Sequence, residues 1–248
     1  MNQKFVIVLC IIFISSLIYS QNTKDTFSLV LIKDNDFLSM YKSSDSTFEE
    51  VGKIPYGTTG IKTTWKTVNN ENNPWIEIIY NDKKGWVKRE YLTRAFGKYG
   101  KKEKDKTIDL LINLTKSLQQ EDPLSFKELF YSLRGFSVFD TNSKILKTFT
   151  YKDINRLWLG ITDNKKITSN NNFKKIFADI LKILESDFII EYNHDPAKNK
   201  NFPVEITNFE YVLLKCKYDP RLSNITLYIG IEFWNNKPFI SSIITAYQ

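Results

Sequence analysis

Short apolar segments separated by turn residues recur between residues 26 and 96, and this pattern constrains the fold more than any other feature of the sequence. In Trp75–Tyr80 the side chains alternate between the two faces of an expected strand. The polar turn Asn81–Lys84 follows it, and Gly85–Val87 begins the next expected strand. Short strands joined by turns at even spacing are typical of a small all-β barrel. We therefore expect residues 26–96 to form such a domain.

The same segment resembles a known family, the bacterial SH3 domains. The motifs that carry the resemblance are Leu38-Ser39-Met40-Tyr41, Val51-Gly52-x-Ile54-Pro55-x-Gly57, Trp75-Ile76-Glu77-Ile78-x-Tyr80-Asn81-Asp82-x-x-Gly85-Trp86-Val87 and Tyr91-Leu92. The resemblance implies an SH3-like barrel that is secreted and attaches to peptidoglycan or to another wall component. Family members usually carry Asn-Val-Arg-Ser-Gly where this chain has Ser39–Ser43, so the family's standard ligand mode is not implied.

Aromatic residues near the expected turns and strand ends are the candidate ligand-binding residues. They are Tyr41, Tyr56, Trp65 and Tyr91. Loops gather at the ends of a small barrel, where aromatic rings can stack on the flat faces of peptides or sugars. The alternative is that this edge of the barrel packs against the second half of the chain.

Three residues of the motif are expected to be structural. Trp75 and Trp86 are large apolar groups on short strands, which predicts core packing rather than ligand contact. Gly85 lies between a turn and a strand, and we expect it to adopt a backbone conformation that a side chain would strain.

The first 20 residues predict a secretory signal peptide. Lys4 precedes an apolar run of 15 residues from Phe5 to Tyr19, which is shorter than the roughly 20 residues that a membrane-spanning helix needs. We expect cleavage near Ser20–Gln21 and a secreted or periplasmic protein of the cell envelope, which meets the membrane only through this signal. An uncleaved anchor is the alternative.

Composition narrows the class of partner. Loss of the signal removes Cys10 and leaves Cys216, so no intramolecular disulfide is possible, which favours a bacterial envelope. The single histidine, His194, argues against a metal site built from several histidines, and we expect neither a metal nor a cofactor. A net charge of +7 favours anionic surroundings such as wall polymers or lipid headgroups. Secretion makes nucleic acid a poor candidate partner.

A connector and a second domain are expected after the barrel. Residues 97–106 combine two glycines with a run of charged residues, which predicts a solvated linker. Residues 107–248 show helical spacing first and strand patterns later. Helices are expected from Thr107 through Leu118, after Asp122-Pro123, after Thr150 and over 172–186; strands are expected over 136–139, 188–192, 210–218, 225–234 and 239–247. The order predicts an α+β roll, with helices packed on one face of an antiparallel sheet.

This expected roll is similar in architecture to nuclear-transport-factor-2-like (NTF2-like) or cystatin-like domains. The segment Gly135–Asp140 also resembles part of uncharacterised domains of secreted bacterial proteins. Neither resemblance implies an activity.

No catalytic motif stands out. Glu191–Asp195 is the densest polar cluster, and its His194 is a candidate general base beside carboxylates, although the same residues suit a turn that ends a strand. Cys216 alternates with Val212 and Leu214, which predicts a small buried hydrophobe rather than a nucleophile. The sequence lacks a Gly-x-Ser-x-Gly elbow, a His-Glu-x-x-His helix and a glycine-rich phosphate loop.

These observations favour a secreted, non-enzymatic binding protein of the cell envelope. Its first domain would dock on peptidoglycan or a wall-associated protein, and its second domain would supply another binding surface. One alternative is a cell-wall hydrolase that the first domain holds on its substrate. Another is a protein that inhibits or assembles with a partner and dimerises through the open face of the sheet.

Overall fold

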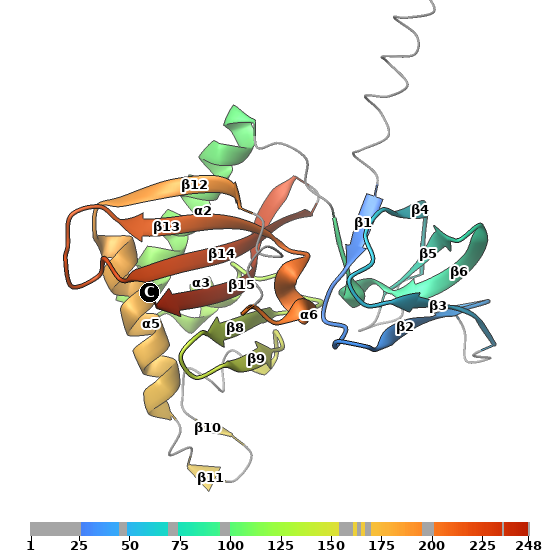
Figure 1. The fold of residues 1–248 in the computed structure, drawn as a ribbon, viewed down its shortest axis with the longest axis horizontal. Coiled ribbons are helices and arrows are strands. Elements are labelled where there is room, and N and C mark those ends of the chain that lie inside the picture. The colour runs from blue at the N-terminus through green and yellow to red at the C-terminus, as the bar shows by residue number, and fades with distance from the viewer. Residues whose placement is uncertain are drawn as a thin grey trace, which may run out of the picture.

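The computed structural model describes residues 26–44, 49–68, 74–94, 100–153, 161–162, 165–166, 170–194, 201–234 and 236–247. Within these residues the chain forms two large sheets that lie next to each other, with the long helices on the far side of the second sheet (Figure 1). Strands dominate both halves. A groove lies on the helical side of the second sheet.

The first sheet has seven antiparallel strands in the order β3-β2-β6-β5-β4-β1-β7. Its strands are β1 (Thr26–Leu29), β2 (Phe37–Tyr41), β3 (Glu50–Pro55), β4 (Ile61–Val68), β5 (Trp75–Tyr80), β6 (Lys83–Lys88) and β7 (Leu92–Arg94), with a short 3-10 helix, η1 (Arg89–Tyr91), before β7. Strands β5 and β6 pair in full register across the tight turn at Asn81 and Asp82, which both have positive φ. That turn chemistry is typical of a hairpin.

The predicted combination of an SH3-like barrel over 26–96 and an α+β roll over 107–248 is wrong. A closed barrel has no edge strands, whereas β3 and β7 are the two open edges of the first sheet. Strand β2 joins β6 through the single pair Tyr41 and Trp86. Strand β7 pairs with β1, and the carbonyl of its Leu92 accepts a hydrogen bond from Arg134 in the second half of the chain.

The second sheet has six strands in the order β12-β13-β14-β15-β8-β9. Its strands are β8 (Phe136–Asp140), β9 (Ile145–Phe149), β12 (Phe188–His194), β13 (Glu210–Cys216), β14 (Ile225–Trp234) and β15 (Lys237–Tyr247); β10 (Ile161–Thr162) and β11 (Lys165–Lys166) form a separate pair. The expected hairpin of the last two strands is present as β14 and β15. The sheet is mixed rather than antiparallel, because β8 lies parallel to β15.

Helices cover one face of this second sheet (Figure 1). They are α2 (Lys101–Gln119), α3 (Pro123–Lys127) and α5 (Asn170–Glu185), while the short α6 (Val204–Thr207) lies elsewhere. Their apolar sides bury a single core against β14 and β15, including Leu114, Phe126, Ile180, Leu227 and Ile243. None of the helices in the described part of the chain is long and apolar enough to cross a membrane.

The opposite face of the second sheet carries another buried cluster, to which α6 contributes. Val30, which follows β1, belongs to a buried cluster with Ile206 of α6 and Ile244 of β15. The ring of Phe27 stacks on Trp234 with centroids 5.9 Å apart. Part of the sheet face expected to mediate dimerisation is therefore covered by α6 and by Val30, and the dimer stays a prediction.

The segment predicted as a connector contains the start of a helix. α2 begins at Lys101, so residues 101–106 form its first turns. Lysine and glutamate are good helix formers, and Glu103 lies in the first turn, where a negative charge is favourable. Charge alone did not distinguish an exposed helical turn from a linker.

Candidate functional site

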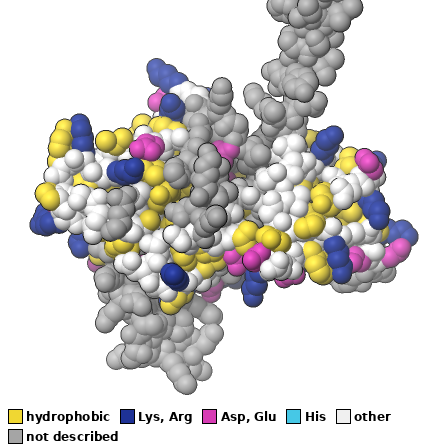
Figure 2. All heavy atoms as spheres, in the orientation of Figure 1, with side chains coloured by type: hydrophobic (Ala, Val, Ile, Leu, Met, Phe, Trp, Pro, Cys, Tyr) yellow, Lys and Arg dark blue, Asp and Glu magenta, His cyan; other side chains and the backbone are white. Residues whose placement is uncertain are grey.

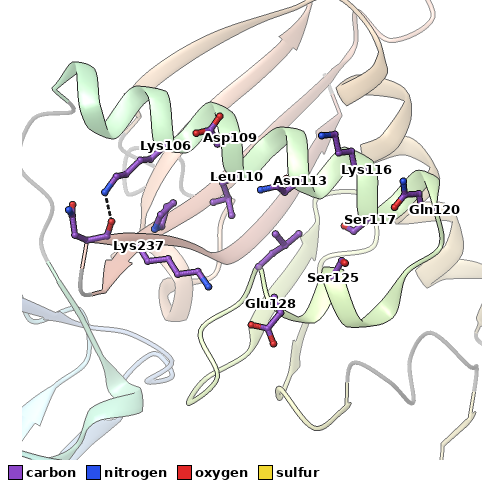
Figure 3. Close-up of a pocket in the computed structure, with 13 residues that line it drawn as sticks. Lys106, Asp109, Leu110, Asn113, Lys116, Ser117, Gln120, Ser125, Glu128 and Lys237 are labelled. Atoms are coloured by element: carbon purple, nitrogen blue, oxygen red, sulfur yellow. Dashed lines mark hydrogen bonds between the residues drawn. The ribbon is translucent and has the colours of Figure 1, made fainter.

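A groove of about 600 Å³ runs along α2 on the helical side of the second sheet (Figure 3). One wall is α2, and the other is formed by α3 and by the turn that joins β14 to β15. Its lining is Lys106, Asp109, Leu110, Asn113, Lys116, Ser117, Gln120, Ser125, Glu128, Leu129, Asn236, Lys237 and Pro238.

Helical spacing places the α2 residues of the groove on one stripe. The lining positions recur every three or four residues from Lys106 to Gln120, which is the spacing that aligns side chains along one face of a helix. Leu110 and Ser117 are buried at the floor of this stripe, whereas Asp109, Asn113 and Lys116 are exposed at its rim. With the buried Leu129 from the other wall, the groove therefore has a largely apolar floor and polar edges.

The N-terminal cap of α3 fixes one end of the groove. Asp122 accepts hydrogen bonds from the main-chain N–H groups of Leu124 and Ser125 at 3.0 and 3.3 Å, and from the Ser125 hydroxyl at 2.5 Å. The Ser125 hydroxyl, followed by these main-chain donors, lowers the pKa of the Asp122 carboxyl. Pro123 occupies the first turn, as the sequence predicts.

A lysine closes the other end. The Lys106 ammonium donates to the main-chain carbonyl of Asn236 at 2.5 Å, which ties α2 to the β14–β15 turn. Asn236 has φ of 64°, a turn conformation that asparagine tolerates. The groove is thus closed at this end by a charge-assisted hydrogen bond.

The groove carries charges of both signs. Its lining includes three ammonium groups, from Lys106, Lys116 and Lys237, and two carboxylates, from Asp109 and Glu128. Such a lining can bind a polar ligand that itself carries both signs. Among the described residues, no cluster of three histidine, cysteine or acidic side chains could hold a metal ion.

Glu128 is held in place by the loop after β9. Its Oε1 accepts a hydrogen bond from the Tyr151 hydroxyl at 2.8 Å. Burial, and then this contact with Glu128, raises the pKa of Tyr151. The Lys127 ammonium lies 4.2 Å from the centroid of the same ring. Glu128 thus reaches the groove as a positioned acceptor.

The four aromatic candidates of the first sheet have different packing partners. Tyr41 meets Trp75 edge-on, with centroids 5.7 Å apart. Tyr56 and Tyr91 are partly buried and pack against the core of the first sheet. A hydrogen bond to Asp34 raises the pKa of Tyr56, and burial raises that of Tyr91.

Trp65 is the exposed member of these four, with 53% of its surface accessible. It has φ of 65°, which is rare for a bulky residue, and lies where β4 shifts register against β5. Its main-chain N–H donates to the Thr63 hydroxyl at 3.0 Å, and its ring meets Phe27 edge-on at 6.0 Å. Trp65 is therefore the candidate in this sheet that is best placed for a partner.

The three motif residues expected to be structural differ in burial and in the reason for which each residue type stands at its position. Trp75 is buried and Trp86 is half-buried. The backbone of Gly85 lies outside the left-handed region, so the prediction that its backbone conformation would strain a side chain is wrong. Lack of room for a side chain explains why a glycine stands here, because a Cβ at Gly85 would lie 2.3 Å from Cγ of Met40 and 2.9 Å from Cγ2 of Val51.

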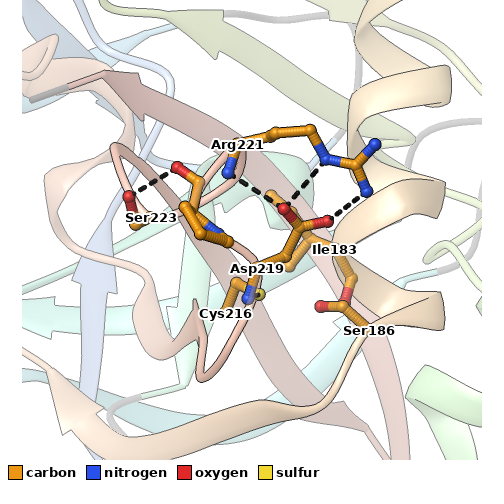
Figure 4. A network of polar contacts seen from close by, with 7 residues as sticks. Ile183, Ser186, Cys216, Asp219, Arg221 and Ser223 are labelled. Atoms are coloured by element: carbon orange, nitrogen blue, oxygen red, sulfur yellow. Dashed lines mark hydrogen bonds and ion pairs between the residues drawn. The ribbon is translucent and has the colours of Figure 1, made fainter.

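Cys216 lies at the end of β13 in a polar network rather than in a purely apolar site (Figure 4). Its sulfur accepts a hydrogen bond from the Asp219 N–H at 3.3 Å, and it is half-buried. The Ser186 hydroxyl beside it, and then the main-chain N–H groups of Asp219 and Tyr218, lower the pKa of the thiol. Asp219 is itself paired with Arg221 at 2.8 Å.

The polar cluster around His194 lies at the end of β12. The strand reaches His194, which pairs with Tyr211 after a shift in register, and Asp195 lies outside the described residues. The structure does not describe the side chain of His194. Its role as a general base stays a hypothesis.

The spacing of apolar residues alone does not reveal the groove. It assigns Ile108 to the buried side of the helix, but Ile108 is 40% exposed and Leu110 is buried instead. The polar residues at 106, 109, 113, 116 and 120 share the spacing of one helix face, and this signal could have indicated a polar groove.

Comparisons with known proteins assign no family. No family model matches this sequence, and no curated protein matches it. Among solved structures, an NTF-2-like protein of unknown function from Shewanella oneidensis MR-1 is 9% identical over 57% of this chain and 97% of that chain, with a TM-score of 0.30. A TM-score of this size carries no argument about fold. The resemblance to bacterial SH3 domains finds no support in these comparisons, and the similarity to NTF2-like domains has only this weak match.

Proposed function

We propose that this chain is a non-enzymatic binding protein of the bacterial cell envelope that holds a polar wall component, peptidoglycan or a wall-associated protein, in the groove along α2. The groove's lining of ammonium, carboxylate, amide and hydroxyl groups over an apolar floor carries the proposal. Concave sites with a few convergent polar groups are the usual place for a ligand. The envelope location rests on the expected signal peptide.

On the face that Figure 2 shows, basic side chains do not gather into a single patch. Figure 2 shows lysine and arginine side chains spread around the edges of the visible face and interspersed with acidic ones. Long-range attraction between exposed charges is screened within about 8 Å at physiological salt. Binding in the groove would combine its charges with amide and hydroxyl hydrogen bonds and apolar contacts, so part of the interaction should survive added salt.

Sedimentation with purified insoluble peptidoglycan tests the proposal. The chain without its first 20 residues should sediment with peptidoglycan both at about 0.15 M and at about 1 M salt, where the screening length falls to about 3 Å. The variant Lys116→Gln should sediment less. Lys102→Gln is the matched control, because Lys102 lies on the same helix, is exposed and does not line the groove.

Three results would overturn the proposal. Binding that disappears at high salt, or that falls equally in both variants, would reduce the interaction to adsorption by lysines. Absence of binding to peptidoglycan and to envelope proteins would remove the envelope ligand. Release of soluble sugar or peptide fragments during the incubation would show that the protein is an enzyme.

A further inference from the structure

We infer that the groove along α2 takes a short, extended peptide that carries both carboxylates and an amine, rather than a glycan strand. The inference deepens the proposed function and rests on it, because it names the ligand class of the same groove. Length, hydrogen-bonding chemistry and charge each support it.

The length of the groove matches a short extended chain. Its α2 wall is lined from Lys106 to Gln120, and a helix rises 1.5 Å per residue, so the wall is roughly 21 Å long. An extended peptide advances about 3.3 Å per residue. A segment of about six residues would therefore occupy the full groove, whereas a single amino acid or a free ion would fill a small part of it.

Side-chain amides are placed along both walls. Asn113 and Gln120 are exposed on α2, and Asn236 is exposed on the opposite wall. Each amide offers a carbonyl acceptor and an NH₂ donor, the same pair of functions that a peptide bond presents. Asn113 and Gln120 are seven residues apart on the helix, which corresponds to about three residues of an extended peptide, so the amides can hydrogen-bond to separate peptide units without requiring a particular side chain.

The charged side chains of the groove favour a ligand whose termini and side chains carry the opposite charges. Lys106 and Lys237 lie at the end beside the β14–β15 turn, and Lys116 lies further along α2. An ammonium has three donors, so the bond from Lys106 to Asn236 leaves two for a ligand carboxylate. Glu128 and Asp109 supply acceptors for an amine. A peptide with charges of both signs complements this lining better than a neutral one.

The floor and lining also disfavour a sugar strand. Leu110, Leu129 and Pro238 supply apolar surface in the groove that can contact aliphatic side chains. None of the thirteen described residues that line the groove is aromatic. Flat aromatic surfaces are the groups that stack on sugar faces, so a glycan would lack its usual platform here.

Isothermal titration calorimetry with defined probes tests the inference. The probe is the synthetic hexapeptide Ala-Glu-Ala-Lys-Ala-Glu with free termini, titrated into the chain without its first 20 residues. We expect saturable binding, weakened at least about fivefold by Lys116→Gln and by Asn113→Ala, because each removes a hydrogen-bonding partner. Lys102→Gln should bind as the unmodified chain does, and thermal melts should show that all variants are folded.

Comparator ligands separate the possible outcomes. A tripeptide of the same residue types should bind more weakly, and equal binding would contradict occupation of the full groove. Binding of an N-acetylglucosamine hexasaccharide in place of the peptide would overturn the inference in favour of a glycan. If peptidoglycan sediments with the chain but the hexapeptide does not bind, the inference fails and the proposed function stands. If the hexapeptide binds through Lys116 but peptidoglycan does not, the ligand class stands and the proposed wall ligand fails.

Discussion

Arg134 donates from Nη1 to both carboxylate oxygens of Glu232, at 2.9 and 2.8 Å, and both side chains are buried, with 1% and 0% exposed. The other nitrogens of the guanidinium donate hydrogen bonds to β7 of the first sheet and to η1 before it. Nη2 donates to the carbonyl of Leu92 at 2.7 Å, and Nε donates to the carbonyl of Glu90 at 2.7 Å. One arginine therefore links β14 of the second sheet to the edge of the first.

Removal of the negative charge in this pair should destabilise the whole chain. In Glu232→Gln the buried guanidinium of Arg134 keeps its charge and loses its counter-ion. Breaking a buried ion pair from one side costs about 3–5 kcal/mol, so the free energy of unfolding should fall by about that amount. Urea denaturation followed by circular dichroism measures the change.

An exposed ion pair provides the control for this variant. Glu191 lies 3.6 Å from Lys215, and both side chains are about half exposed. Exposed pairs contribute about 0–1 kcal/mol, so Glu191→Gln should change stability little. Equal losses in Glu191→Gln and Glu232→Gln would contradict the role given to the buried pair.

The two sheets should unfold in one transition. Phe27 of β1 stacks on Trp234 of β14, and Trp234 stacks on Tyr131 with centroids 4.9 Å apart. Separation of the sheets would expose all three rings together with the Arg134–Glu232 pair. Urea curves from tryptophan fluorescence, which reports mainly on the first sheet, and from circular dichroism at 222 nm, which reports on α2 and α5, should coincide. Two separate midpoints would show that the sheets are independent units.

Local patterns in the sequence predicted much of the secondary structure. The expected strand Trp75–Tyr80 is β5, and the expected helix over 172–186 is α5 with its ends shifted slightly. The cap of α3 follows from Asp122-Pro123. These features depend on neighbouring residues, where alternation, helical spacing and capping act directly.

The docking of the sheets could not be predicted in the same way. Arg134 and Glu232 are 98 residues apart, and nothing near either residue indicates its partner. The environment of edge strand β7 could not be predicted either, because Arg134, which donates to the carbonyl of Leu92, lies 42 residues away in the sequence. The groove also depends on a distant contact, since α3 and the β14–β15 turn form its second wall.

A side chain at Gly85 should lower the free energy of unfolding, because it would clash with its neighbours. In Gly85→Ala the new Cβ would overlap Met40, and overpacking of a core costs about 1–3 kcal/mol. In the double variant Gly85→Ala, Met40→Ala the new methyl occupies space that Met40 vacates. Its loss of stability should therefore be smaller than the sum of the two single losses, as measured by urea denaturation. An additive result would contradict the proposed clash.

The cap of α3 should contribute to the dependence of stability on pH. The pKa of Asp122 is lowered below its ordinary value of 3.8 in the folded chain, so its stabilising effect is complete above about pH 4 and is lost as the pH falls through the folded-state pKa. An asparagine at this position would cap the helix without titrating. The melting temperature of Asp122→Asn should therefore fall less than that of the unmodified chain between about pH 5 and pH 2. Parallel curves would show that the cap carries no titrating contribution.

Hydrogen exchange with mass spectrometry, on the chain without its first 20 residues and with soluble peptidoglycan fragments, tests the central claim most directly. Exchange slows where a ligand covers or stabilises the backbone. We expect slower exchange in the segments that line the groove, residues 106–120 of α2, residues 125–129 and the β14–β15 turn. Slower exchange confined to β4 around Trp65, with α2 unchanged, would place the ligand on the first sheet and contradict the proposed site.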